Sequence, residues 1–536
     1  MRNLQGIYLL GDPCLVQETP EPFQGVRSEG IECDQNLRGL EKDLQKKYLC
    51  RCLTECDLEE MKCMILEYFK RSGYRFVDVI IPPQEVTDCV LQLLILQTRL
   101  CNVEICGNWW TSDKRLLNYL RLEPGSPIMV DSVLRSLTWM NRNPFRRVDA
   151  IFEPGTDCGT TSIRLLVDER RHFRGYYGWD DRGNDAIGKY RQFVGLNWGS
   201  PFYYDGVLSV QFTASSQYSK LQAVSGRYES YLPWGDTLSF YGGYSHVHSE
   251  HLGYSFHNKG HSWQGSFRYD ISLKPRGYWM QWITVGADFK QTNNNLEFSE
   301  IPIFSKIAAL LQFVGGYRFQ LEPTWASLLF KIDVMVSPNF NMPHQNALDY
   351  ESLRPFAKPF YVYGKAFFES TIRLPYKICF IGRVQGQLAS RNLLPSEEFG
   401  IGGMDTVRGY EERIANGDRG ALINLELFTP PLFFQDCAVC LDGNCVSCED
   451  RFKKRCCNTI RDSFRLLGFV DIGTTAVQKN IPGEKSGETL VGVGPGLRYL
   501  IEPYLHLQVD YGLRLTKVDQ DNRGGGRFHF VAIASF

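Results

Sequence analysis

Six cysteines lie close together between residues 437 and 457, and thiols are the side chains with the most evident chemistry here. The first four have the spacing Cys-x2-Cys-x4-Cys-x2-Cys, which resembles a zinc knuckle because four thiolates suit tetrahedral zinc. The chain has 17 cysteines, an odd number and many for a reduced cytosolic enzyme. We favour disulfides, within or between chains, and keep metal binding and free thiols as alternatives for Cys437, Cys440, Cys445, Cys448, Cys456 and Cys457.

A second group of potentially reactive side chains consists of histidines: five of the nine lie in the polar segment 246–261. Neutral imidazole binds borderline metals. A solvated polar loop is the simpler interpretation, and we predict no metal site here. The histidines are His246, His248, His251, His257 and His261.

A glycine-rich segment places one arginine where it needs an anionic partner. Glycines permit tight turns, and a permanently charged guanidinium must be paired if it is buried. The residues are Gly402, Gly403, Val407, Arg408, Gly409 and Tyr410. From chemistry alone, a surface arginine in a glycine-rich loop is the alternative.

About sixty residues further on, a strand-like segment offers that partner. Its marked residues are Gly468, Phe469, Asp471 and Gly473. Alternation puts Phe469 and Asp471 on the face opposite Val470 and Ile472. We therefore predict that Arg408 pairs with Asp471 and holds its loop against that face.

The elements that must position these residues are long alternating strands. From about residue 172 onward apolar and polar residues alternate, most clearly over 263–273, 326–336 and 504–513. A soluble sandwich alternates too, but ten-residue strands with ionisable groups on one face are typical of a tilted strand crossing a bilayer. About sixteen such runs are present. We predict a 16-stranded antiparallel transmembrane β-barrel over residues 169–536.

The connections between these runs alternate in length. Short turns such as 232–236 and 375–377 are rich in Pro or Gly, and long polar loops separate them. This asymmetry is typical of an outer-membrane barrel. The arginine segment lies in the longest loop, 391–418, and strand counting places the cysteine-rich insertion, 430–461, on the short-turn side. The last run ends on Phe536, which we interpret as a barrel-terminal signal.

The first 170 residues have mixed α+β character. Helical periodicity is clearest at 54–72, where Thr54 and Asp57 have capping-box spacing. We predict two βααββ units, at 24–98 and 99–168, preceded by an N-terminal extension over 1–23.

Composition excludes several classes of protein. The chain has 59 Lys+Arg against 60 Asp+Glu and a net charge of −1, which gives no basis for nucleic-acid binding. No run of about 18 apolar residues is present, which argues against a helical membrane protein. We find no phosphate-binding loop, nucleophile elbow or metalloprotease helix, and predict neither an enzyme nor a cofactor.

Together these motifs resemble the outer-membrane two-partner secretion transporters, the haemolysin/adhesin secretion–activation family, whose superfamily also holds the barrel-assembly proteins. Val407–Tyr410 match the superfamily's sixth extracellular loop, which inserts into the lumen, and residues 468–473 match its partner strand. Pro82-Pro83-Gln84, Asn141-Arg142-Asn143-Pro144, Gly155 and Thr160-Thr161 resemble the POTRA domains of the transporter branch.

The resemblance implies two periplasmic POTRA domains and a monomeric barrel in the bacterial outer membrane, in contact with its lipid and lipopolysaccharide. The POTRA domains would recognise an unfolded adhesin- or haemolysin-like partner, which crosses the lumen without ATP. The alternative is a barrel-assembly and insertion factor. Such factors commonly carry more POTRA repeats, whereas this chain has room for two. The family's signal peptide and plug helix are not evident in residues 1–22.

Overall fold

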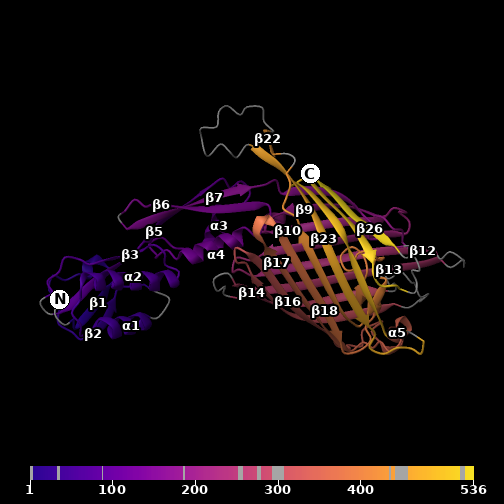
Figure 1. The fold of residues 1–536 in the computed structure, drawn as a ribbon, viewed down its shortest axis with the longest axis horizontal. Coiled ribbons are helices and arrows are strands. Elements are labelled where there is room, and N and C mark those ends of the chain that lie inside the picture. Colours follow the sequence, from indigo (N-terminus) through magenta and orange to yellow (C-terminus); the bar gives the residue numbers. More distant parts are fainter. Residues whose placement is uncertain are drawn as a thin grey trace. The chain divides into compact units, whose positions relative to one another are not determined.

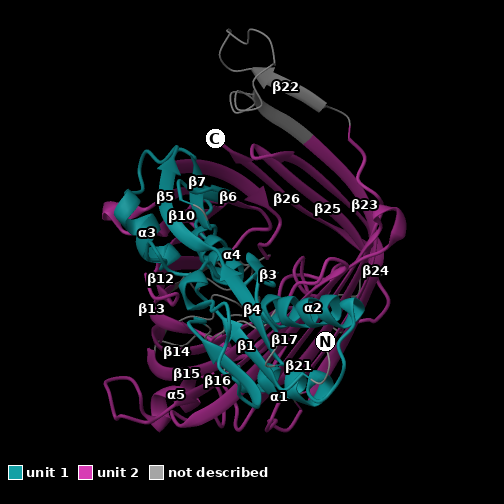
Figure 2. Ribbon diagram, turned by 90° about the vertical axis from the view of Figure 1, so that its left-hand side faces the viewer, with its two compact units in different colours: residues 1–171 teal, residues 172–536 magenta. Residues whose placement is uncertain are grey.

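The structure is a computed structural model that describes residues 4–32, 37–86, 89–157, 159–184, 187–250, 257–273, 279–292, 307–433, 436–440, 457–483, 485–518 and 525–536. The chain divides into two compact units, Met1–Arg171 (unit 1) and His172–Phe536 (the barrel unit), which are described separately. Figure 1 labels their elements, and Figure 2 colours the two units.

The first half of unit 1 is a four-stranded sheet with two helices. The strands have the order β2-β1-β4-β3, and β1 is parallel to both β2 and β4. The elements are β1 (Gly6–Leu10), β2 (Gly25–Glu29), α1 (Arg38–Tyr48), α2 (Glu55–Arg71), β3 (Val77–Ile80) and β4 (Val90–Gln97).

Strand β1 corrects the predicted N-terminal extension over residues 1–23. Its Ile7, Leu9 and Leu10 are fully buried, whereas the more polar β2 forms the edge of the sheet. A short apolar run is what a central strand of a small sheet requires. The first α+β unit therefore begins before residue 24 and has one strand more than predicted.

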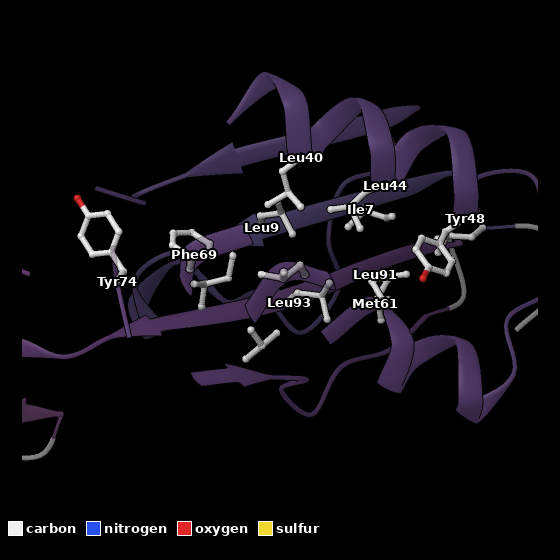
Figure 3. Packing of buried hydrophobic residues seen from close by; sticks show 14 residues of the cluster. Ile7, Leu9, Leu40, Leu44, Tyr48, Met61, Phe69, Tyr74, Leu91 and Leu93 are labelled. Atoms are coloured by element: carbon white, nitrogen blue, oxygen red, sulfur yellow. The ribbon is translucent and has the colours of Figure 1, made fainter. Parts of the chain in front are cut away.

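Helix α2 begins where its capping residues predict. The Thr54 side chain accepts the Asp57 backbone N–H, and the Asp57 carboxylate accepts the Thr54 backbone N–H. This reciprocal pair satisfies donors that a helix start leaves unpaired. Met61 and Phe69 of α2 then pack with Leu40 and Leu44 of α1 against the sheet (Figure 3).

The second half of unit 1 has the predicted βααββ order. Strand β5 pairs in parallel with the central β7, which pairs antiparallel with β6. Its buried core includes Leu116, Leu120 and Val133. The elements are β5 (Arg99–Cys106), α3 (Asp113–Leu120), α4 (Val130–Met140), β6 (Arg146–Pro154) and β7 (Thr160–Glu169). No helix within the described ranges is long and apolar enough to cross a membrane.

The barrel unit confirms the predicted fold class. Sixteen described strands form a closed wall in which sequence neighbours pair antiparallel and the last strand pairs with the first. They are β8 (Phe173–Asp180), β9 (Arg191–Gly199), β10 (Gly206–Ser215), β11 (Leu221–Tyr231), β12 (Thr237–Glu250), β13 (His257–Ser272), β14 (Trp279–Thr292), β15 (Ala308–Leu321), β16 (Ala326–Ser337), β17 (Tyr361–Arg373), β18 (Cys379–Ala389), β21 (Arg419–Phe428), β23 (Cys457–Ala476), β24 (Gly487–Glu502), β25 (Leu505–Arg514) and β26 (Gly526–Ser535).

The two faces of the wall differ as the alternation predicts. On β23, Val470 and Ile472 are exposed on the outside, whereas Phe469 and Asp471 are buried on the inside. An apolar exterior and a polar interior suit a strand that faces lipid on one side only.

Candidate functional site

The loop between β18 and β21, residues 391–418, folds back against the inner wall of the barrel, and we call it the lumen loop. It contains a short hairpin of β19 (Phe399–Ile401) and β20 (Ala415–Gly417). Its apolar side chains Ile401, Val407 and Tyr410 form a buried cluster with Leu422 and Leu490 of the wall. The loop is therefore packed in place along part of its length.

Arg408 at the tip of the lumen loop is in contact with Asp471 of β23. The Arg408 Nε donates to Asp471 Oδ2 at 2.7 Å, and Nη2 donates to Oδ1 at 2.8 Å. The Arg408 backbone N–H adds a third hydrogen bond to Oδ2, at 3.1 Å. Both side chains are buried, with 3% of Arg408 and none of Asp471 exposed. A bidentate, charge-assisted pair fixes position and orientation together.

Two further carboxylates complete the surroundings of Arg408. Its Nη1 donates to Glu426 Oε1 of β21 at 2.7 Å and lies 3.5 Å from Asp510 Oδ2 of β25. The wall residue Arg498 in turn binds Asp510 through two hydrogen bonds of 2.6 and 3.0 Å. Burial alone disfavours the charged guanidinium, but the hydrogen bond to Asp471 and the nearby carboxylates raise the pKa of Arg408.

The ring of Phe469 forms the floor of this site. The Arg408 Cζ lies 3.6 Å from the centre of the Phe469 ring, so the guanidinium packs on the aromatic face. Such a contact is stronger where both groups are removed from water. Phe469 and Asp471 of one strand thus hold the same side chain from two directions.

Glycines on the wall leave room for the loop backbone. A Cβ on Gly492 would lie 2.1 Å from the Arg408 carbonyl oxygen, and one on Gly512 would lie 2.3 Å from the Gly409 nitrogen. Gly473 leaves similar room for the Val407 side chain. Gly409 itself has φ +101°, a backbone conformation that favours glycine. The loop tip can approach the wall only because these positions have no side chains.

Tyr410 anchors the loop on the other side of Arg408. Its hydroxyl lies 2.7 Å from the Thr516 carbonyl oxygen and 3.0 Å from that of Val491, and it accepts the Thr516 backbone N–H at 3.1 Å. Gly402 and Gly403 begin the tip with φ +104° and +103°. The structure thus brings together every residue singled out in residues 402–410 with Asp471, Phe469 and Gly473, whereas Gly468 lies apart.

Comparison with known proteins now identifies the family. A model of the haemolysin secretion/activation protein ShlB/FhaC/HecB matches residues 159–442, which is more than half of the chain. The chain belongs to the ShlB/FhaC/HecB family. A model of the Omp85 superfamily domain matches residues 361–536, which include the lumen loop and β23.

Named relatives of this ShlB/FhaC/HecB member are transporters. The heme/hemopexin transporter protein HuxB of Haemophilus influenzae (strain 86-028NP) is 21% identical over 391 residues, which cover 71% of this chain and 67% of HuxB. The outer membrane transporter CdiB of Dickeya dadantii (strain 3937) is 24% identical over 398 residues, with the same two coverages. The protein is therefore an outer-membrane member of the two-partner secretion transporters.

Solved structures share the fold. CdiB from Escherichia coli superposes with a TM-score of 0.78 at 15% identity, over 100% of this chain and 90% of that one. BamA from Haemophilus ducreyi lacking POTRA domains 1–3 has a TM-score of 0.50 at 14% identity, over 96% of this chain and all of that one. The α+β units of unit 1 are accordingly POTRA domains, which are periplasmic in homologues.

Wall residues of the site that were not singled out in the sequence include Glu426, Asp510, Gly492 and Gly512. All four lie on lumen-facing positions of strands next to or near β23, and acidic residues are common on any polar lumen wall. Glycines at lumen-facing positions would have been a more specific signal than acidic residues. Glycine weakens a strand, so its presence on the inner wall of the ShlB/FhaC/HecB barrel indicates that another backbone approaches closely.

Phe536 lies directly after β26, where the barrel closes. Its backbone N–H donates to the Gly175 carbonyl oxygen at 3.0 Å, and the Gly175 N–H donates to the Phe536 carbonyl oxygen at 3.1 Å. Its side chain is 76% exposed. Whether it acts as a terminal signal stays a prediction.

The cysteine-rich insertion is only partly described. Strand β22 (Asp436–Cys440) pairs with the start of β23, so that Cys440 lies opposite Cys457 in the backbone register. Cys437 lies on the same strand, and Cys445, Cys448 and Cys456 lie outside the described residues. Eight cysteines elsewhere in the described part of the chain are free thiols: Cys14, Cys50, Cys52, Cys56, Cys63, Cys101, Cys106 and Cys379. The choice between disulfides, metal and free thiols in the insertion stays a prediction.

The two described ends of the histidine segment lie in strands rather than in a loop. His246 on β12 and His261 on β13 are register partners, and their Nδ1 atoms lie 3.2 Å apart. The two strands continue further into this segment than predicted: β12 ends at Glu250, and β13 begins at His257. His251 lies outside the described residues. Among the described side chains, no group of three His, Cys, Asp or Glu residues could hold a metal ion.

Proposed function

We propose that this protein secretes an unfolded partner protein across the outer membrane through its own barrel. The observation that carries the proposal is a lumen loop held by a buried ion network inside a closed barrel of the ShlB/FhaC/HecB family. The ionic hydrogen bonds that hold the tip of this loop can be exchanged for water when the loop moves. The polar wall behind it can hydrate the amides of an extended chain in transit.

The POTRA domains supply the recognition step of this proposal. Strands β2 and β3 are the edges of the first sheet, and β5 and β6 are the edges of the second. An extended client can add a strand to such an edge and gain backbone hydrogen bonds without a specific sequence. HuxB is named a heme/hemopexin transporter and CdiB an outer membrane transporter. The family description names haemolysin secretion and activation, and by analogy we infer an adhesin- or haemolysin-like secreted partner here.

We propose that the protein is a transporter and not an enzyme. Folding of the client outside the cell would give transport its direction without ATP. The barrel closes on its own strands, so we propose that it works as a monomer. Its exposed aromatic exterior, which includes Phe240, Tyr244 and Trp263, would lie against lipid and lipopolysaccharide.

Quantitative proteomics of the culture medium and the outer membrane, with and without this protein, tests the proposal. We expect one or two large proteins to disappear from the medium while other outer-membrane barrels keep their abundance. A broad fall in outer-membrane barrels would instead show an assembly factor. An unchanged medium and an unchanged membrane would overturn both functions.

A further inference from the structure

The seam between the first and last strands is the one place where neighbouring wall strands of the described barrel are far apart in sequence. Five residue pairs join β26 to β8, from Val531–Asp180 to Ser535–Tyr176, against eight pairs between β8 and β9. No turn connects the two strands, because one opens the barrel and the other ends it. Closure of the seam therefore rests on non-covalent contacts.

Asp181 extends the seam beyond the Val531–Asp180 pair. Its backbone N–H donates to the Phe530 carbonyl oxygen at 3.3 Å, and its Oδ1 accepts the Phe530 N–H at 3.0 Å. Its second oxygen, Oδ2, lies 3.0 Å from His529 Nδ1. Asp181 and His529 are 4% and 1% exposed. A residue that follows β8 is thus tied to two successive residues of β26.

His529 carries this connection onward to the lumen loop. The Gly409 N–H donates to His529 Nε2 at 3.0 Å. A nitrogen that accepts cannot carry a hydrogen, so the ring hydrogen is on Nδ1 and is donated to Asp181. With its hydrogen on Nδ1, the imidazole of His529 on β26 bonds both to Asp181, which follows β8, and to Gly409 at the loop tip.

Charged pairs run beside this imidazole across the same seam. Arg527 of β26 donates to Glu411 of the loop at 2.9 Å and lies 3.8 Å from Asp181. On the β8 side, Arg182 donates to Asp405 of the loop at 2.8 Å. The loop is thus bonded to both sides of the seam. These contacts lie apart from the Arg408–Asp471 pair, which ties the loop to β23.

We propose that His529 couples the docking of the lumen loop to the closure of the barrel seam. When the loop leaves, His529 loses the Gly409 N–H that fixes its ring, and its bond to Asp181 is less well oriented. Because coupling between two sites is reciprocal, loosening the seam also weakens loop docking. Only the use of this coupling in transport rests on the proposed function.

Three substitutions separate the two hydrogen bonds of His529. His529→Ala removes both. His529→Asn keeps a donor near the position of Nδ1, toward Asp181, and His529→Gln keeps an acceptor near that of Nε2, toward Gly409. His506→Ala changes another histidine, on the neighbouring strand β25, and serves as the control.

Two measurements on the full-length protein report on closure of the seam and on docking of the lumen loop. Seam closure is followed by the temperature at which the folded barrel loses its fast migration in SDS electrophoresis. Loop docking is followed by ion conductance in planar bilayers. We expect His529→Ala to lower that temperature by about 5 °C and to raise conductance. His529→Asn should mainly raise conductance, His529→Gln should mainly lower the temperature, and His506→Ala should change neither.

The coupling itself is tested by combining His529→Ala with Arg408→Ala, which undocks the loop by another route. Coupling predicts that the temperature shift from His529→Ala shrinks by at least about half in the Arg408→Ala background. Additive shifts would overturn the proposal. So would Asn and Gln variants that each change one property and leave the other at its wild-type value, because reciprocal coupling requires part of each effect to reach the other site.

These two conservative variants carry the test if His529→Ala fails to assemble. Neither measurement uses a client protein. An unchanged medium in the proteomics experiment would therefore refute the proposed function and leave the coupling intact, and additive shifts would do the reverse.

Discussion

Between helices α1 and α2 and their sheet, unit 1 buries Leu40, Leu44 and Phe69, whereas the barrel unit buries Arg408, Asp471 and Asp510 between its lumen loop and its wall. Apolar burial is non-directional and scales with area. Ionic hydrogen bonds depend on distance and angle, and leaving one partner unpaired is costly. Unit 1 is thus stabilised by non-directional apolar packing, whereas the tip of the lumen loop is held in one position that ionic hydrogen bonds specify.

Arg408→Ala should have the largest effect, because it removes the cation that pairs with the buried Asp471 and leaves Glu426 and Asp510 with only their other arginine partners. Losing one partner of a buried ion pair costs about 3–5 kcal/mol. We expect secretion to be lost while a folded barrel remains, as measured by client in the medium and by heat-modifiable migration of the barrel. Arg227→Ala removes a pair with Glu229 in which the arginine side chain is largely exposed, and it should change neither. Normal export by Arg408→Ala would contradict a role in gating.

Leu44→Ala tests the apolar side of the comparison. Leu44 is fully buried in unit 1, so its truncation should lower the free energy of unfolding of that unit by about 2–5 kcal/mol. Urea unfolding followed by circular dichroism at 222 nm reports it, since most of the described helices lie in unit 1. Lys42→Ala, at an exposed position of α1, is the control. A change in barrel conductance with Leu44→Ala would contradict the expectation that this substitution affects unit 1 alone.

Gly492→Ala disturbs the docked loop tip without removing any charge. The new Cβ would lie 2.1 Å from the Arg408 carbonyl oxygen, so the loop tip must move. Overpacking of this kind costs about 1–3 kcal/mol, and we expect a rise in conductance. Gly468→Ala is the matched control, because its Cβ would meet nothing within 4 Å. Equal conductance in the two variants would show that close contact with the wall does not position the loop.

Thr54→Ala should have the smallest effect. It removes the oxygen that accepts the Asp57 N–H at the start of α2, and such caps contribute about 1 kcal/mol. The urea midpoint of the helical signal should fall, and Thr54→Ser should restore most of it because serine offers the same acceptor. No change in Thr54→Ala would mean that tertiary packing alone fixes the start of α2.

The barrel and the Arg408 contact were predictable because each depends on a signal carried within one segment. Alternation can be read strand by strand, and strand parity puts Asp471 on the lumen face without knowledge of the partners. The α2 start was predictable for the same reason, since Thr54 and Asp57 are three residues apart.

The remaining parts depend on register between distant strands. Asp510 and His529 have ordinary lumen-facing residue types, and only the placement of β25 and β26 beside the loop gives them a role. Strand β1 was missed because five residues are too few for a periodic signal and its partner β4 is far along the chain. The part of the insertion that carries Cys445 and Cys448 lies outside the described residues.

Strand β1 also constrains the order in which the first POTRA domain can fold. Gly6–Leu10 is made first, yet its partner Val90–Leu94 follows 84 positions later, and the sheet cannot close until both are present. Pairings so distant in sequence form slowly and leave apolar strands exposed in the meantime. A periplasmic chaperone that shields Ile7 and Leu9 during this interval would speed productive folding. The second domain would need it less, because Arg99 of β5 pairs with Thr160 of β7, which follows 61 positions later.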